Sequence, residues 1–467
     1  MNRAWSQIGN FLSPEHSGIS RARFLALALL LLFTVPAWLS AQEAPVRVQA
    51  KTKYSTSAQI GYEMVDSLRF YQLRLIHEIG YKKFGIGLDL DFLFDKHYHL
   101  RKADWDHLED IVDKIYYIKY GSVGDPLYLQ VGGFPGISVG HGLSMQDYSN
   151  MQLYPELRNT GLLFGASPRW TLKPSFELFS SDVRKNEIMF LTARCNPVAD
   201  STLWLLDELS LGASLVTDLD QYGNLRRLVK NQFEDDVRKL KKDAVTIIGA
   251  GYTLPLLEKE NITLGNYAEM AYIFGNGAGA ILPGFYGEFY KILRLSLEYR
   301  LYGNEFTPAF FDGHYEEERA LQPDAEVADF VTKEDALRDC KRAEGFNGRV
   351  DAFLFKKVKL MYAWQNMLGR DLETGRSFWA KISVDTRFRR LENFSLAYNK
   401  IKTNSLGIGK FVEPNAEFKL GMTFRVHKRW FVTGKYAEAY KDKNENGSVD
   451  WLKETKRSFS IGAKYIY

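Results

Sequence analysis

Charged side chains recur at every second position in several segments and are the largest set of groups that could act on a solute. In 378–388, Lys381, Asp385 and Arg387 alternate with apolar residues. Successive side chains of a β-strand point to opposite faces, so this spacing predicts one charged and one apolar surface. We expect the charged surface to contain Arg74, Glu78, Asp89, Asp91, Arg294, Glu298, Arg300, Lys359, Lys381, Asp385, Arg387, Glu417, Lys419, Arg425, Lys435 and Lys464.

This set contains more basic than acidic residues, and most of the basic ones lie in the C-terminal half of the chain. Rings of one charge at a constriction select ions in pores, so the set would mildly favour anions. The alternative is that the charges only hydrate a wall and pair with one another across neighbouring strands.

A second candidate site is a calcium-like loop at 442–450, which reads DKNENGSVD. Asp442, Asn444, Asn446 and Asp450 offer oxygen atoms at the spacing by which a loop wraps a hard cation. The twelfth position is Lys453 instead of a bidentate glutamate, which lowers the expected affinity for Ca²⁺. An ordinary turn is the alternative, because Asn-Gly is a common turn signal. We predict no other cofactor.

Two further stretches combine unusual residues without indicating a chemistry. GFPGISVGHGLSMQDYSN (133–150) contains G-x-S-x-G around Ser138, and FFDGHYEEER (310–319) joins aromatic to charged residues. A hydrolase would need its serine on a strand-to-helix elbow with a distant histidine and an acid. The surrounding pattern supplies no such helix, so we predict that the chain is not an enzyme; a lipid hydrolase is a minor alternative.

Strands of about ten residues must position these groups, because the alternation repeats along almost the whole chain. At 293–301 apolar residues alternate with Arg294, Ser296, Glu298 and Arg300, and 416–426 and 84–94 are similar. Aromatic residues end many of the apolar faces, as at Tyr71 and Tyr81, Phe378 and Phe388, and Trp430 and Tyr440. Such length and such aromatic girdles are typical of strands that span a bilayer.

The composition narrows the class of protein. The 467 residues carry a formal net charge of +4, which argues against nucleic acid as a partner. Two cysteines exclude a disulfide-built scaffold. Residues 24–39 form an apolar run after Arg21 and Arg23, and Ala41 is a small residue suited to cleavage. We predict a cleavable signal peptide at 1–41 and a single domain at 42–467.

With this signal and a final strand that ends in the aromatic Tyr467, the chain resembles the porin-like outer-membrane β-barrel proteins of diderm bacteria. The resemblance is to the superfamily and identifies no particular family. It implies an outer-membrane location, contact with membrane lipid, and recognition of Tyr467 by the barrel-assembly machinery. We therefore expect an all-β, antiparallel, up-and-down transmembrane barrel with an even number of strands, about 16 to 20.

Long and short connections alternate between the expected strands, which is the pattern of outer loops and periplasmic turns. The outer loops are expected near 95–112, 135–156, 218–244, 303–345 and 441–456, with some helix at 224–243 and 316–343. This topology separates Cys195 from Cys340, so we predict no disulfide between them. The lumen should hold water unless 135–156 or 303–345 folds into it.

Two functions fit this sequence. The first is a channel that passes small hydrophilic solutes with weak selectivity, and a homo-oligomer is compatible with it. The second is a non-conducting surface barrel whose long loops bind partners and close the lumen.

Overall fold

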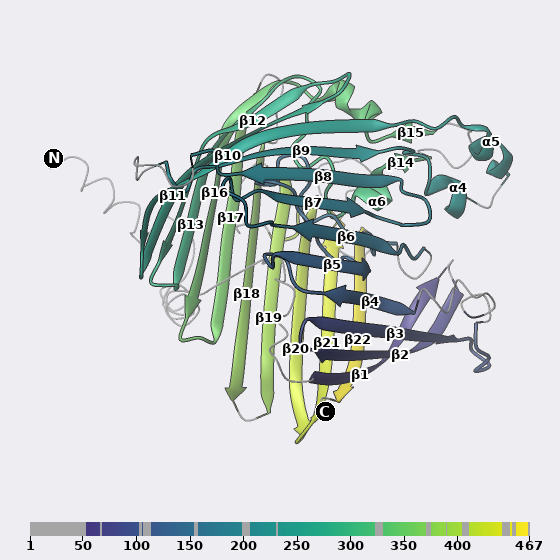
Figure 1. Cartoon of the computed structure of the whole chain (residues 1–467). Helices are drawn as coiled ribbons and strands as arrows, with labels where there is room; N and C mark the ends of the chain where they lie inside the picture. The colour runs from purple at the N-terminus through teal and green to yellow at the C-terminus, as the bar shows by residue number, and fades with distance from the viewer. Residues whose placement is uncertain are drawn as a thin grey trace, which may run out of the picture.

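Long antiparallel strands follow one another through the described part of the chain. The computed structural model describes residues 53–65, 68–101, 105, 114–153, 157–198, 206–229, 232–322, 330–369, 375–388, 390–403, 411–440, 449–450 and 454–465. Twenty of its strands form one sheet, in which each strand pairs with its neighbours in sequence (Figure 1). The predicted fold class is confirmed, and the strand number lies at the upper end of the expected range.

The first half of the sheet consists of β1 (Lys53–Val65), β2 (Leu68–Tyr81), β3 (Phe84–Phe94), β4 (Ile115–Tyr120), β5 (Leu127–Gly132), β6 (Gly161–Ala166), β7 (Ser175–Ser180), β8 (Ile188–Cys195), β9 (Ser210–Asp218) and β10 (Val245–Lys259). The second half consists of β11 (Ile262–Ile273), β12 (Ala278–Phe289), β13 (Leu293–Tyr302), β16 (Ala343–Leu354), β17 (Val358–Gly369), β18 (Arg376–Phe388), β19 (Leu391–Thr403), β20 (Ala416–His427), β21 (Trp430–Tyr440) and β22 (Thr455–Tyr465).

The sheet closes on itself because the first strand pairs with the last. Thr56 lies opposite Tyr465, and Ala58 lies opposite Ala463, in an antiparallel ladder. The start of β1 and the end of β22 therefore lie at the same end of the barrel. The two-residue turn at Lys82 and Lys83 also lies at this end. We call it the turn end and the opposite end the loop end.

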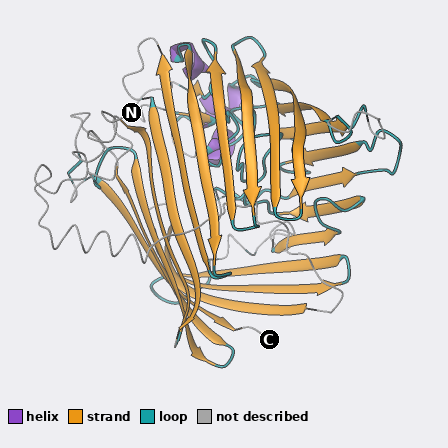
Figure 2. Cartoon of the chain, turned by 90° about the vertical axis from the view of Figure 1, so that its left-hand side faces the viewer, coloured by secondary structure: helices purple, strands orange, loops and turns teal. Residues whose placement is uncertain are grey.

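Short helices interrupt the long connections at the loop end. They are α4 (Leu225–Leu228), α5 (Glu234–Lys239), α6 (Tyr315–Glu318) and the 3₁₀ helix η3 (Asp335–Asp339), and β14 (Ala320–Leu321) pairs with β15 (Val331–Thr332). Figure 2 shows helical segments within the curve of the sheet. Among the described residues, no helix has the length and apolar character needed to cross a membrane.

The outward face of the strands is apolar and exposed, as the period-two pattern requires. Ile60, Met270 and Phe285 are 63%, 60% and 48% exposed. Tyr71 and Tyr81 are 47% and 53% exposed at the two ends of this face. An apolar band with aromatic edges is the surface that a bilayer covers.

The aromatic girdle departs from the expectation at two positions. Phe378 and Tyr440 lie on the outward face, yet they are only 0% and 1% exposed. Val412 and Val449, from the connections after β19 and β21, pack against them. The prediction of an exposed girdle at these two residues is wrong, because loop-end segments cover the outer wall there.

Candidate functional site

Two segments far apart in the sequence fold into the barrel and pair with each other. Residues 133–150 and 306–319 form this structure, which we call the plug. The backbone N–H of Ala309 donates to Leu143 O at 2.7 Å, and that of Gln146 donates to Phe311 O at 3.0 Å. A parallel bridge joins Met145 to Phe311. The two loops expected to be able to enter the lumen, 135–156 and 303–345, therefore both fold into it.

Aromatic side chains form the core of the plug. Phe310, Phe311, Tyr315 and Tyr148 are fully buried, and they share one apolar cluster with inward-facing residues of the wall. Those wall residues include Leu163, Phe179, Phe190, Val216, Ile247, Ala271, Ile273, Ile281 and Tyr302, and the cluster extends to Ala343 and Met367. The plug thus packs against β6–β13 and fills that side of the lumen.

A buried ion cluster fixes the plug to the loop end of the wall. Arg319, whose side chain is 1% exposed, lies 2.7 Å from Glu187, 3.4 Å from Glu316 and 3.7 Å from Asp218. Burial lowers the pKa of Arg319, but the three carboxylates outweigh this and raise it. Burial raises the pKa of Glu187, but the charges of Arg319 and Arg227 outweigh this and lower it. Arg319 and Glu187 therefore stay charged at neutral pH.

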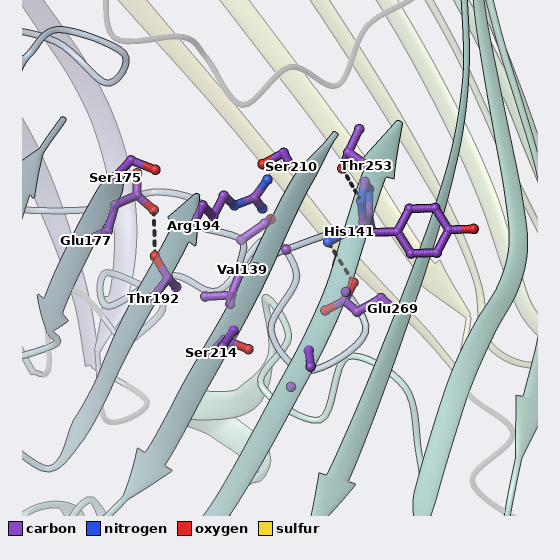
Figure 3. A pocket seen from close by; sticks show the side chains of 18 of the residues that line it. Val139, His141, Ser175, Glu177, Thr192, Arg194, Ser210, Ser214, Thr253 and Glu269 are labelled. Atoms are coloured by element: carbon purple, nitrogen blue, oxygen red, sulfur yellow. Dashed lines mark hydrogen bonds between the residues drawn. The ribbon is translucent and has the colours of Figure 1, made fainter. Parts of the chain in front are cut away.

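The tip of the plug is held by a different set of contacts. The backbone N–H of His141 donates to Glu269 Oε2 at 2.6 Å, and its ring hydrogen-bonds Thr253 at 3.0 Å (Figure 3). The ring also stacks on Tyr267 with 4.0 Å between centroids. Gly140 has φ +62°, and a Cβ there would come within 2.5 Å of Glu269. Burial, assisted by the charge of Arg194, lowers the pKa of His141 to about 4.

Several of the predicted inward charges, in the N-terminal half of the chain and on β13, form ion pairs or hydrogen bonds with neighbouring side chains. Arg74 lies 2.6 Å from Asp89, and Gln72 donates to Asp91 at 2.9 Å. Arg300 lies 2.5 Å from Glu298 in the same way. Two others contact aromatic rings: Glu78 accepts a hydrogen bond from Tyr117, and Lys359 lies over Phe353.

Other predicted charges face the part of the lumen that the plug leaves open. Lys381, Asp385 and Lys435 are exposed on β18 and β21. Lys419 lies 2.8 Å from Glu417, with 57% of its side chain exposed. Arg425 pairs with Glu392 and keeps 43% of its side chain exposed. Arg294 pairs with Glu288 and is half exposed. The side chains of Arg387 and Lys464 lie outside the described residues.

Asp147 of the plug lies within electrostatic range of Arg349 on the inner wall. Enclosure inside the barrel raises the pKa of Asp147, and the charge of Arg349 opposes that effect. Arg349 belongs to the inward face of β16 and pairs with Asp351 at 2.7 Å. Ser138 contacts the same residue: its Oγ accepts a hydrogen bond from the backbone N–H of Asp147 at 2.9 Å. His141, the histidine closest to Ser138 in sequence, contacts Thr253 instead.

Several predicted features fall outside the described residues. These are the signal peptide at 1–41, Asp442, Asn444 and Asn446 of the calcium-like loop, and Tyr467. Asp450 is described, and its N–H donates to Glu454 at 2.8 Å. Within the described ranges, no group of three or more histidine, cysteine, aspartate or glutamate residues is placed to hold a metal ion. Cys195 and Cys340 are both free thiols.

The groups that fix the plug, and one polar cluster on the outer wall, could not be identified from the sequence pattern. Arg319 and Glu316 lie within the stretch 310–319, whose mixture of aromatic and charged residues was the only signal. On the outward face, Lys400 is fully buried 2.8 Å from Glu413, and Arg457 donates to Glu438 at 3.0 Å. These outward charges break the apolar alternation of their strands.

No family model matches the chain, and no curated protein sequence matches it. Among solved structures, it is similar to OccK2 of Pseudomonas aeruginosa in complex with glucuronate, at 10% identity, TM-score 0.35, and coverage of 89% of this chain and 98% of that one. OccAB2 of Acinetobacter baumannii gives 8% identity, TM-score 0.34, and coverage of 89% and 98%. A BenF-like porin from Pseudomonas fluorescens gives 9%, 0.34, 89% and 99%. Scores this low carry no weight for function. The closed antiparallel sheet with its apolar outer band is what places the chain among the transmembrane β-barrels.

Proposed function

We propose that this protein is an outer-membrane channel through which small hydrophilic solutes pass beside a fixed plug. The observation that carries the proposal is the contrast between the two sides of the lumen. Apolar and small residues of β6–β13 pack against the plug, whereas charged side chains of β18–β21 remain exposed on the inward face. Exposed charges on an inner wall need water, so the open side provides an aqueous route.

The charges along this route favour anions weakly. Lys381 and Lys435 are exposed there, and Lys419 and Arg425 keep much of their side chains exposed although each contacts a glutamate. Asp385, on β18, offsets part of this positive charge. Since exposed pairs interact weakly in water, a modest preference is expected in place of strict selectivity.

The topology suits an outer membrane. Short connections such as Lys82-Lys83 gather at the turn end, together with the start of β1 and the end of β22. We infer that the turn end faces the periplasm and the loop end faces the outside, with the expected signal peptide directing export. Assembly would depend on the barrel-assembly machinery, as the resemblance implies.

A non-conducting surface barrel is the second candidate. It is favoured by the extent of the plug, whose aromatic core and ion cluster are buried. In that case the open side would be a blind vestibule, and the loop-end segments would serve to bind partners.

Conductance of the purified, refolded barrel in a planar bilayer separates the two. We expect steady ohmic steps, with a reversal potential in a salt gradient that favours anions. A barrel that shifts on heating in a gel, and is therefore folded, but shows no conductance would support the surface barrel. Preference for cations would contradict the role given to the basic inner wall.

A further inference from the structure

A cavity lies between the tip of the plug and the inner wall, on the side that the plug otherwise fills. It has a volume of about 270 Å³ and is lined by Ser138–His141 of the tip and by inward residues of β7–β11 (Figure 3). The wall is hollow there because Gly212, Gly249 and Gly251 carry no side chain. This is far more than the ~10–15 Å³ that a single water needs on the same measure, so the space can hold several waters or a small solute.

Two carboxylates border this cavity, and both already accept hydrogen bonds. Glu177 accepts from the hydroxyl of Tyr128 and from Thr192 at 3.4 Å. Glu269 accepts the backbone N–H of His141 at 2.6 Å. Both acids therefore have protein donors and leave little need for a cationic ligand.

The one cation in the lining is differently placed. Arg194 projects from β8 between Glu177 and His141 (Figure 3). Within the described ranges, its guanidinium makes no hydrogen bond or ion pair that meets ordinary geometric limits. A guanidinium offers five donors in a planar fork that matches a carboxylate. In a half-enclosed site those donors call for an acceptor from outside the chain.

Hydroxyl groups surround this guanidinium. Ser175, Thr192, Ser210, Ser214 and Thr253 all line the cavity, and each hydroxyl can both donate and accept. Val123 and Val139 are the only large aliphatic side chains in the lining. The surroundings suit a ligand rich in hydroxyl groups better than an apolar one. The nearby Glu177 and Glu269 disfavour a doubly charged anion such as a phosphate monoester.

We propose that this cavity binds a small hydroxylated monocarboxylate, with the carboxylate on Arg194 and the hydroxyls on the serine and threonine side chains. The inference rests on the proposed function in one respect, namely that the solute reaches the cavity through the lumen. The ligand bridges the plug tip and the wall, so the site lies beside the open route and is separate from the basic wall of β18–β21.

The test measures binding to the full-length barrel in detergent micelles by equilibrium dialysis, which needs no conductance. The probes are erythronate, a four-carbon acid with three hydroxyls; erythritol, which has hydroxyls but no charge; and butyrate, which has the charge but no hydroxyls. We expect erythronate to bind about 10- to 100-fold more tightly than either, because each lacks one set of charge-assisted or hydroxyl contacts. Equal binding of erythronate and erythritol would overturn the assignment to an anion. Equal binding of butyrate would overturn the role of the hydroxyls.

Variants locate the site. Arg194→Gln keeps a polar side chain but removes the charge, and should weaken erythronate binding by about 10- to 100-fold. Arg238→Gln makes the same exchange at an exposed arginine of α5, outside the cavity, and should leave binding within twofold. If the two variants bind alike, the site is not at Arg194.

A second variant distinguishes loss of the binding site from a folding defect. Ser210→Phe keeps every charge and fills part of the cavity, so erythronate binding should be lost while the barrel keeps its heat-modifiable migration. Binding that survives Ser210→Phe would overturn the proposal. Conductance is recorded on the same samples. Conductance without erythronate binding would overturn the Arg194 site and leave the proposed channel function standing. Erythronate binding to a barrel that shows no conductance would support the site and overturn the channel function.

Discussion

Replacing Arg319 by methionine should release the plug from the wall while leaving the barrel closed. Methionine replaces the apolar stem of arginine but not its guanidinium, so the substitution removes the cation and leaves Glu187, Glu316 and Asp218 close together. It also removes the hydrogen bonds from the guanidinium to Gln221 O at 3.2 Å and to Asp220 O at 2.9 Å. The strands themselves keep all their backbone hydrogen bonds.

The size of the effect follows from the burial of the pair. Removing one partner of a buried ion pair costs about 3–5 kcal/mol, because the remaining charges stay out of water without compensation. Each ~1.36 kcal/mol changes an equilibrium tenfold. The fraction of molecules with the second plug segment detached should therefore rise by roughly 150- to 5,000-fold. The upper figure assumes that no water enters to hydrate the three carboxylates.

Limited trypsin digestion measures this fraction, because Lys333 precedes η3 and Arg338 lies within it, on the same connection as the second plug segment. If the segment closes faster than trypsin cuts, the cleavage rate follows the detached population. The control is Arg338→Met, which removes an exposed pair with Asp335 at 3.2 Å and should cost only ~0–1 kcal/mol. Because it also removes one tryptic site, cleavage is scored at Lys333 in both variants. Equal rates at Lys333 in the two variants would refute the view that Arg319 fixes the plug.

Three shorter predictions concern the route and the tip. Lys381→Glu should move the reversal potential toward cations, since reversing one charge ~8 Å from an ion in water changes its energy by about 1 kcal/mol, roughly fivefold in the permeability ratio. The pKa of His141 lies at about 4 in place and near 6.5 when free, so the attached tip is fully favoured above pH 6.5 and loses up to about 3 kcal/mol as pH falls to 4; amide exchange at 136–144 should quicken over that range, and His141→Gln should flatten the dependence. Gly140→Ala, which combines φ +62° with a contact to Glu269, should speed the same exchange by more than Gly124→Ala, which has φ +93° but no atom within 4 Å of the added Cβ; equal effects would mean that only backbone strain matters.

The strands could be predicted because their pattern is local. The alternation at 430–440 coincides with β21, and the closing pairs of β1 and β22 follow once each strand is in phase. Phe378 shows the limit of this reasoning. Its place on the outward face is correct, but its burial depends on Val412 and Val449, and no period in the sequence specifies where a loop folds back.

The plug illustrates the same limit from inside the barrel. The stretches 133–150 and 310–319 were the two least ordinary in the sequence, and they pair with each other across more than a hundred residues. The partners of Arg319 come from β9, from the connection between β7 and β8, and from α6. Nothing in the local sequence around these residues marks them as partners. Only the closure of the barrel brings them together.

The way the plug is held also decides which kind of channel this can be. Three sets of contacts hold the plug against β6–β13: the aromatic core, the buried ion cluster and the contacts of His141. Complete departure of the plug would expose all three to water at once. Exposing the buried side chains of Phe310 and Phe311 alone would cost about 1.5–3 kcal/mol each, so fewer than one molecule in about a hundred would have lost the plug at any moment. A channel that opened by expelling the plug would therefore be closed almost always. Steady conductance from the unmodified protein has to follow the exposed wall of β18–β21 past a plug that stays in place, and Arg319→Met should then enlarge an existing current instead of creating one.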